Sequence, residues 1–234
     1  YYIMDEGSRI SILLPSKWTL IARDGFNGTV LWKKPIEKWS NHMWPLKTGP
    51  SQLTRRLVAD GDRIFVANEL EGPVSCFDGP TGELVRTYPD TKGTEEILFE
   101  NGVLYLLANP GSWTLTEYAP KLQQDQARVA GEYQWDRSVR QLMAVQADSG
   151  KTLWKKEVTC APITLGTDGK NVVYYNGDGV VCLDAASGIE RWSSKQQGIR
   201  KKIEFNFGPR VLLHSGMVLY LSLIHISEPT RPER

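Results

Sequence analysis

The side chains of this sequence that could take part in chemistry are a few aspartates, cysteines and histidines. The chain of 234 residues has three cysteines and three histidines. The cysteines are widely spaced and match neither a metal-site pattern nor a disulfide framework. Three aspartates, Asp24, Asp78 and Asp184, each stand shortly before a glycine and could form an acidic site. The sequence has no phosphate-binding glycine loop, no His-Glu-x-x-His motif and no nucleophile elbow.

The three aspartates belong to a repeat, which changes their interpretation. Four segments share a small residue, an aspartate or glutamine two residues later, a glycine four residues after that, and a tryptophan or arginine after four more. They are Ala22, Asp24, Gly28 and Trp32; Cys76, Asp78, Gly82 and Arg86; Ala144, Gln146, Gly150 and Trp154; and Cys182, Asp184, Gly188 and Trp192. An aspartate that accepts backbone N–H groups and a glycine with positive φ are typical of tight turns. The aspartates are therefore predicted to form turns.

The remaining reactive side chains have no motif around them. Cys76 and Cys182 occupy the small-residue position of the repeat and are predicted to be small buried residues, which leaves Cys160 as the one thiol without such an explanation. His42 and His214 are predicted to be loop or core residues and not a ligand or a base. Asn27 begins a glycosylation sequon, but its Asn-Gly pair is better explained by the turn.

The elements around these turns are predicted to be strands. Four short strands are predicted around the repeat copy that contains Asp184 and Gly188: Ile163–Leu165, Val172–Tyr175, Val180–Leu183 and Glu190–Ser193. Similar apolar runs occupy most of the chain before and after it. They are Tyr1–Met4, Ser11–Leu14, Trp18–Ala22, Thr29–Lys33, Leu57–Ala59, Ile64–Ala67, Val74–Phe77, Leu84–Tyr88, Ile97–Phe99, Val103–Leu107, Leu142–Val145, Thr152–Lys156, Val211–His214 and Met217–Leu221.

Four-stranded meanders that recur in this way predict an all-β partial β-propeller of about four blades. The blades are expected at about 1–34, 54–89, 94–157 and 161–195, with the start of a fifth at 209–220. Each indole of the repeat is expected to lie on the glycine turn of the next blade, where a large flat ring fills a socket shaped by aspartate and glycine.

The motif resembles the tryptophan-docking repeat of the pyrroloquinoline-quinone (PQQ)-type propellers, over residues 1–220. That superfamily holds quinoprotein alcohol dehydrogenases and the propeller lipoprotein of outer-membrane assembly, so the resemblance implies a ring of seven or eight blades and a periplasmic or cell-envelope location. Its quinoproteins carry a vicinal cysteine pair over PQQ and hold calcium with Glu, Asn and Asp. This chain has no Cys-Cys pair. PQQ and calcium are therefore implied by the resemblance alone.

Composition and the two ends complete the sequence evidence. With 41% hydrophobic residues, 24% charged residues and a net charge of +1, the chain gives no reason to expect nucleic acid or an anionic membrane as partner. The chain begins within a predicted strand, and its last residues, 221–234, resemble a translated sequencing adapter. We expect them to be a non-native tail, which removes His225 from any site. Unpaired edges at both ends predict that the isolated chain associates or is poorly soluble.

The start of the innermost strand of each blade is the best candidate for a site, because these segments surround the mouth of the central channel. They carry charges in three of four cases: Arg55 and Arg56, Glu95 and Glu96, Ile163 and Thr164, and Arg210. The expected partner is a protein, a small polar ligand or a glycan. Two aromatic insertions, Pro35–Leu53 and Asn109–Arg140, either dock partners or fold back as lids.

Two functions are compatible with the sequence. The preferred hypothesis is a non-catalytic propeller that serves as a binding or assembly scaffold in an exported bacterial protein. The alternative is part of a PQQ-dependent oxidoreductase whose cofactor ligands lie in other blades, or a propeller fused to an unrelated catalytic domain. No residue of this chain is predicted to be catalytic, cofactor-binding or metal-binding.

Overall fold

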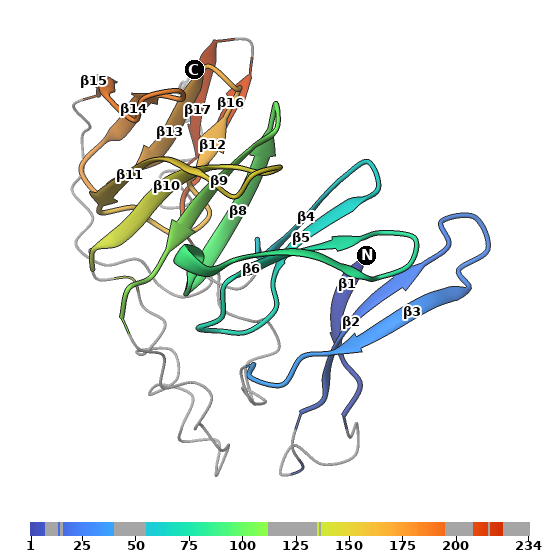
Figure 1. Cartoon of the computed structure of the whole chain (residues 1–234). Helices are drawn as coiled ribbons and strands as arrows, with labels where there is room; N and C mark the ends of the chain where they lie inside the picture. Colours follow the sequence, from blue (N-terminus) through green and yellow to red (C-terminus); the bar gives the residue numbers. More distant parts are fainter. Residues whose placement is uncertain are drawn as a thin grey trace, which may run out of the picture.

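The computed structural model of the chain describes residues 1–7, 14, 16–39, 55–111, 135, 137–194, 208–214 and 216–221. These residues form five antiparallel sheets and one short 3-10 helix, η2 (Pro89–Thr91) (Figure 1). In each sheet the strands lie in the order of the sequence. Among the described residues, no helix is long and apolar enough to cross a membrane.

The first sheet has three strands, the next three have four strands each, and the fifth has two. Their strands are β1 (Tyr2–Asp5), β2 (Trp18–Arg23) and β3 (Val30–Pro35); β4 (Leu57–Asp60), β5 (Arg63–Ala67), β6 (Val74–Asp78) and β7 (Leu84–Tyr88); β8 (Thr94–Glu100), β9 (Val103–Ala108), β10 (Arg140–Gln146) and β11 (Thr152–Val158); β12 (Gly166–Thr167), β13 (Asn171–Tyr175), β14 (Val180–Asp184) and β15 (Glu190–Ser193); and β16 (Arg210–His214) and β17 (Met217–Leu221).

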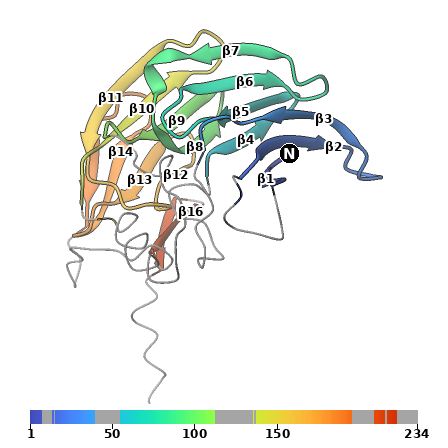
Figure 2. The ribbon, with the colours of Figure 1, turned by 90° about the horizontal axis from the view of Figure 1, so that it is seen from below.

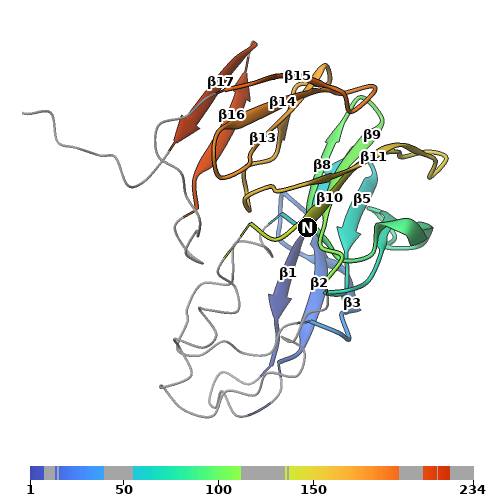
Figure 3. The ribbon, with the colours of Figure 1, turned by 90° about the vertical axis from the view of Figure 1, so that its left-hand side faces the viewer.

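The sheets fan around a shared axis in an open arc (Figure 2), with β7 and β11 on the outside. The first strands of successive sheets, β4, β8, β12 and β16, contact one another near the axis. The first sheet and the fifth sheet lie at opposite ends of the arc (Figure 3). The prediction of an all-β, partial β-propeller is therefore confirmed.

Apolar side chains fill the space between each sheet and the next, because a blade has two faces to bury. One cluster, with Leu20, Val66 and Phe77, joins the first two sheets. Similar clusters join the second sheet to the third, the third to the fourth, and the fourth to the fifth. Each sheet between the two ends of the arc packs against a neighbouring sheet on both of its faces. The first strands near the axis therefore contact strands of neighbouring sheets.

The repeated turn has the same hydrogen bonds in all four copies. The N–H of Gly28, Gly82, Gly150 or Gly188 donates to the carbonyl of the residue four positions earlier, at 2.7–3.0 Å. These glycines have φ between 70° and 76°. The aspartate side chains accept backbone N–H groups from the turn, for example from Ala186 and Ser187 to Asp184. Side-chain bonds from Arg191 and Ser187 contribute most to lowering the pKa of Asp184, to about 2.

Two of the indoles lie on the glycine turn of the following sheet. Trp32 donates its Nε1–H to Gly79 O at 2.7 Å, and Trp154 donates to Ala185 O at 2.9 Å. A Cβ atom on Gly82 or Gly188 would stand 2.7 Å from the facing ring. Trp192 differs, since its side chain is 43% exposed. The fifth sheet offers it only β16 and β17 within the described part of the chain.

The second sheet has Arg86 where tryptophan is expected, and Tyr88 takes over part of the role. Tyr88 lies two residues further along β7, on the same face of the strand. Its hydroxyl donates to Ala147 O at 2.6 Å, and that carbonyl is equivalent to those bound by the two indoles. Arg86 covers Gly150 and donates to Ser149 O at 3.2 Å. Burial is the main reason why the pKa of Tyr88 is raised to about 12.

Two predicted strand boundaries are wrong. Glu95 and Glu96 lie inside β8, which begins at Thr94, and not before the strand. β12 covers Gly166–Thr167 and not Ile163–Leu165. Ile163 has φ of 61°, in the left-handed region, and the Thr164 hydroxyl donates to Ala161 O at 2.7 Å, so a turn precedes the strand. Most of Ser11–Leu14 lies outside the described residues.

Candidate functional site

The charged residues predicted at the channel mouth are mostly inside the protein. Arg56, Glu95 and Glu96 are at most 2% exposed, whereas Arg55 and Arg210 are half-buried. Arg55 and Glu96 face one another across a short parallel bridge between the second and third sheets. Burial of charges is costly unless each one is paired. The partners of these groups therefore determine what the segment can do.

Arg56 ties three segments together. Its Nε donates to Thr94 O at 2.7 Å, and its Nη2 donates to Glu69 O at 3.0 Å and Leu70 O at 2.8 Å. The guanidinium carbon lies 4.9 Å from the centre of the Trp39 ring, a cation–π contact. Arg56 therefore fixes the turn between β5 and β6 against β8, from beneath the surface.

Glu95 has its charge partner in β10. Arg140 Nε donates to Glu95 Oε2 at 2.7 Å, and Arg140 Nη1 donates to Ser138 Oγ at 2.5 Å. Burial raises the pKa of Glu95, and Arg140 acts in the opposite direction. Sequence reasoning missed Arg140, because its partner is 45 residues away along the chain. The signal that could have revealed it is a charge directly before an apolar run in the sequence, as at Glu95 and Glu96.

Glu96 connects the second, third and fourth sheets. Its carboxylate accepts the Ile163 N–H, and Arg55 Nη1 lies 3.4 Å from its other oxygen. Arg55 Nη1 also donates to Leu165 O at 2.8 Å. Burial raises the pKa of Glu96 to about 7, although Arg55 lowers it in part. The left-handed Ile163 thus has its N–H held by this carboxylate, which stabilises the turn before β12.

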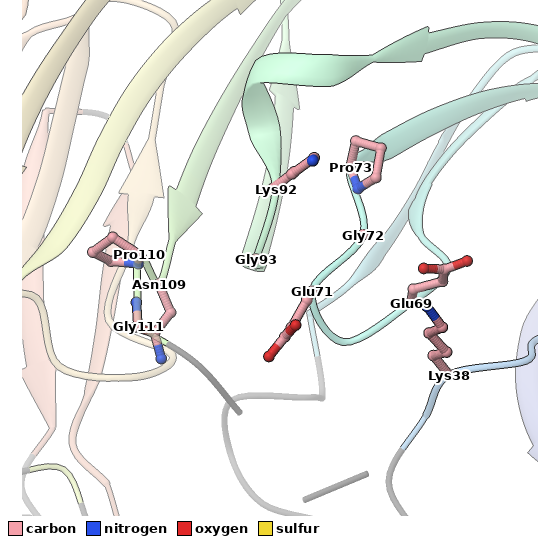
Figure 4. Close-up of a pocket in the computed structure, with 10 residues that line it drawn as sticks. All are labelled: Lys38, Glu69, Glu71, Gly72, Pro73, Lys92, Gly93, Asn109, Pro110 and Gly111. Atoms are coloured by element: carbon pink, nitrogen blue, oxygen red, sulfur yellow. The ribbon is translucent and has the colours of Figure 1, made fainter. Parts of the chain in front are cut away.

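A cavity of about 630 Å³ lies between the second and third sheets. Four connections line it, and their side chains surround the opening in Figure 4. The lining residues are Lys38, Glu69, Glu71, Gly72, Pro73, Lys92, Gly93, Asn109, Pro110 and Gly111. We call this the inter-sheet cavity. It presents two cations, two anions and one amide, a mixed polar surface suited to recognising a polar partner.

Backbone hydrogen bonds join the segments that line the inter-sheet cavity. Gly93 N–H donates to Gly72 O at 3.3 Å, and Asn109 N–H donates to Gly93 O at 2.9 Å. Gly93 has φ of 73°, and a Cβ there would stand 2.4 Å from Asn109 O. Only glycine fits this close approach of the two segments that flank β8 and β9 in the third sheet. Arg56 holds the carbonyl of Glu69 from behind, so the same buried charge that the sequence singled out supports the cavity wall.

The described residues do not fit a calcium or quinone site. They contain no group of three or more His, Cys, Asp or Glu side chains that could hold a metal ion. Cys76, Cys160 and Cys182 are separate, free and buried. Burial also raises the pKa of Cys160 well above its usual value, which disfavours the reactive thiolate. No step through PQQ or calcium can therefore be assigned to these residues.

Several predicted features fall partly or wholly outside the described residues. His42 lies there, as does most of each aromatic insertion. Two insertion residues that are described, Trp39 and Trp135, are buried. Trp39 contacts Trp18, with ring centres 6.2 Å apart, and Trp135 packs against the fourth and fifth sheets. At these two positions the aromatic rings fold back onto the blades.

Comparison with known proteins supports the PQQ-type repeat. Residues 138–221 match the family described as outer membrane protein assembly factor BamB. A search of curated proteins finds no significant match. The structure is similar to the computationally designed Ika8 protein over 91% of this chain and 53% of that one, with 12% identity and a TM-score of 0.50. That degree of likeness concerns the fold alone.

Two natural proteins of known structure have lower TM-scores. BamB from Moraxella catarrhalis is similar over 89% of this chain and 66% of its own, with 12% identity and a TM-score of 0.48. A europium-containing methanol dehydrogenase is similar over 94% and 48%, with 10% identity and a TM-score of 0.48. The chain thus spans about half the length of the dehydrogenase and about two thirds of that BamB.

Proposed function

We propose that this propeller, whose residues 138–221 match a PQQ-type repeat family, is a non-catalytic binding module for a protein partner. The observation that carries the proposal is the inter-sheet cavity, which two sheets form together and which buried Arg56 supports from behind. The partner would bind across Lys38, Glu71 and Lys92 on the rim. The matching family is named for outer-membrane protein assembly, so we propose a cell-envelope location.

The charges of the inter-sheet cavity favour a partner with both signs of charge. Lys38 and Lys92 offer ammonium groups, and Glu69 and Glu71 offer carboxylates on the facing turn. In Figure 4 the Glu71 carboxylate points into the opening, and the Asn109 amide lies on the other side of it. A polypeptide segment supplies cations, anions and amide groups together, which a simple anion or a glycan does not. Complementary charges of this kind set specificity and association rate more than affinity.

Site-specific photo-crosslinking tests the proposal. A photoreactive residue at Glu71 or Lys92 in the full-length protein, expressed in its own host, should capture one defined protein. Val85 is the matched control, since it is exposed on the outer strand β7, away from the inter-sheet cavity. Capture at Val85 equal to that at Glu71 would contradict the proposal.

The same full-length protein distinguishes the proposal from an oxidoreductase. Dye-linked alcohol oxidation after addition of calcium and PQQ should stay at the background rate. A calcium- and PQQ-dependent rate would show that other blades supply the cofactor ligands, and the binding module would then be part of an enzyme.

The Lys92→Glu substitution should reduce photo-crosslinking from Glu71 without lowering the melting temperature, because Lys92 is exposed.

A further inference from the structure

A second cavity lies on the axis of the arc, apart from the inter-sheet cavity. Its volume is about 300 Å³, and the first strands of four sheets, β4, β8, β12 and β16, surround it. Most of its lining side chains are apolar, among them Leu98, Phe99, Leu165, Val211 and Leu213. Several of these residues also pack in the interfaces between sheets, which holds the wall in place. We call this space the axial cavity.

One cation, Arg55, lies at the wall of the axial cavity. Its side chain is 29% exposed, and both of its hydrogen bonds, to Glu96 and Leu165 O, use Nη1. Within the described part of the chain, Nε and Nη2 of Arg55 have no hydrogen-bond partner. A guanidinium presents its donors as a fork that matches the two oxygens of a carboxylate. Arg55 thus has free donors beside an apolar space.

The anion that Arg55 already faces is a weak competitor. The Glu96 contact is long, at 3.4 Å, and the Glu96 carboxylate also accepts the Ile163 N–H. The other charged or titratable groups near Glu96 are Glu95 on β8, its partner Arg140 on β10, and buried Cys160 before β12. Glu100 lies at the far end of β8, on the cavity lining. The end of the axial cavity that holds Arg55 is therefore the end that suits an anion.

We propose that the axial cavity binds an apolar monocarboxylic acid, with the carboxylate on the free donors of Arg55 and the hydrocarbon chain along Leu98, Leu165 and Leu213. The apolar lining provides favourable transfer of the chain from water, and the guanidinium provides the charge-assisted hydrogen bonds. This site is separate from the proposed protein-binding site and does not depend on it. Its ligand differs in class, being a small amphiphile and not a polypeptide.

Binding of octanoate to the full-length protein tests this, measured by calorimetry and by methyl NMR. Octanoate should shift the methyl signals of Leu98, Leu165 and Leu213, and octanol should bind about 10-fold or more weakly, because it lacks the charge. Arg55→Gln should weaken octanoate binding by a similar factor. Arg63→Gln is the control, since Arg63 lies at the start of β5 and pairs with Asp60 and Asp148.

Glu96→Gln provides a test in the opposite direction. Removing the negative charge beside Arg55 should tighten octanoate binding severalfold at pH 8, and wild-type affinity should rise as the pH falls from 8 to 6, while Glu96 gains its proton. Equal binding of octanol and octanoate, or octanoate shifts confined to other methyl groups, would overturn the proposal. The NMR measurement uses the wild-type chain, so it decides the matter even if Arg55→Gln fails to fold.

Discussion

Gly188→Ala should destabilise the chain far more than Gly28→Ala, although both glycines occupy the same position of the repeated turn. Their φ angles are nearly equal, at 70° and 73°. A Cβ on Gly188 would stand 2.7 Å from Cδ2 and Cε3 of Trp154, whereas a Cβ on Gly28 would meet nothing within 4 Å. The pair therefore separates backbone strain from the contact between sheets.

The expected magnitudes follow from these two contributions. A side chain in the left-handed region costs about 1 kcal/mol, and this applies to both variants. Forcing a methyl group into a packed contact costs about 1–3 kcal/mol more, and this applies to Gly188→Ala only. We expect losses of about 1 kcal/mol for Gly28→Ala and about 2–4 kcal/mol for Gly188→Ala in the free energy of unfolding.

Urea denaturation followed by far-ultraviolet circular dichroism measures both losses, since this signal comes mainly from the backbone, which all the variants share. Gly82→Ala should resemble Gly188→Ala, because its Cβ would stand 2.7 Å from the Trp32 ring. In the double variant Gly188→Ala and Trp154→Ala the clash disappears, so the two losses should not add. Equal losses for Gly28→Ala and Gly188→Ala would show that the indole does not seat one sheet on the next.

Four further substitutions test other parts of the structure. Trp154→Ala should cost about 3 kcal/mol in the free energy of unfolding and Trp192→Ala about 1 kcal/mol, because Trp154 lies on a glycine turn and hydrogen-bonds Ala185 O whereas Trp192 is 43% exposed. Urea melts that give the reverse order would contradict this. Tyr88→Phe should cost about 1–3 kcal/mol by leaving the Ala147 carbonyl without its donor, whereas a melt unchanged from wild type would mean that water replaces the hydroxyl. Glu96→Gln should remove part of the pH dependence of the free energy of unfolding. The pKa of Glu96 in the folded protein, about 7, lies above the reference value of 4.5, so the native state binds this proton more tightly than the unfolded state does. Wild-type stability should therefore fall by up to about 3 kcal/mol as the pH rises from 4.5 to above 7. Parallel pH profiles for wild type and Glu96→Gln would refute that assignment.

The burial and the ion pairing of Glu95 and Glu96 could not have been predicted from the sequence. Glu95 and Glu96 look like surface residues at the start of a strand, and pairs of like charge are usually solvated. Their burial is compensated by Arg140 in β10 and by Arg55 before β4, which lie 45 and 41 residues away along the chain. The inter-sheet cavity was missed for the same reason, because four separate connections line it and each is an ordinary polar loop when taken alone.

The sequence by itself determined the repeated turn, and through it the fold. The spacing of Asp184 and Gly188 is local, since the aspartate accepts N–H groups two and three residues later and the glycine supplies the positive φ. Because that turn recurs along the chain, it was sufficient to predict that the strands group into sheets and that the sheets surround a common axis. Only the tertiary structure decided what covers each turn. Tyr88 bonds the carbonyl that a tryptophan would have bound and Trp192 stays half exposed, because these outcomes depend on contacts between sheets and not on neighbours in sequence.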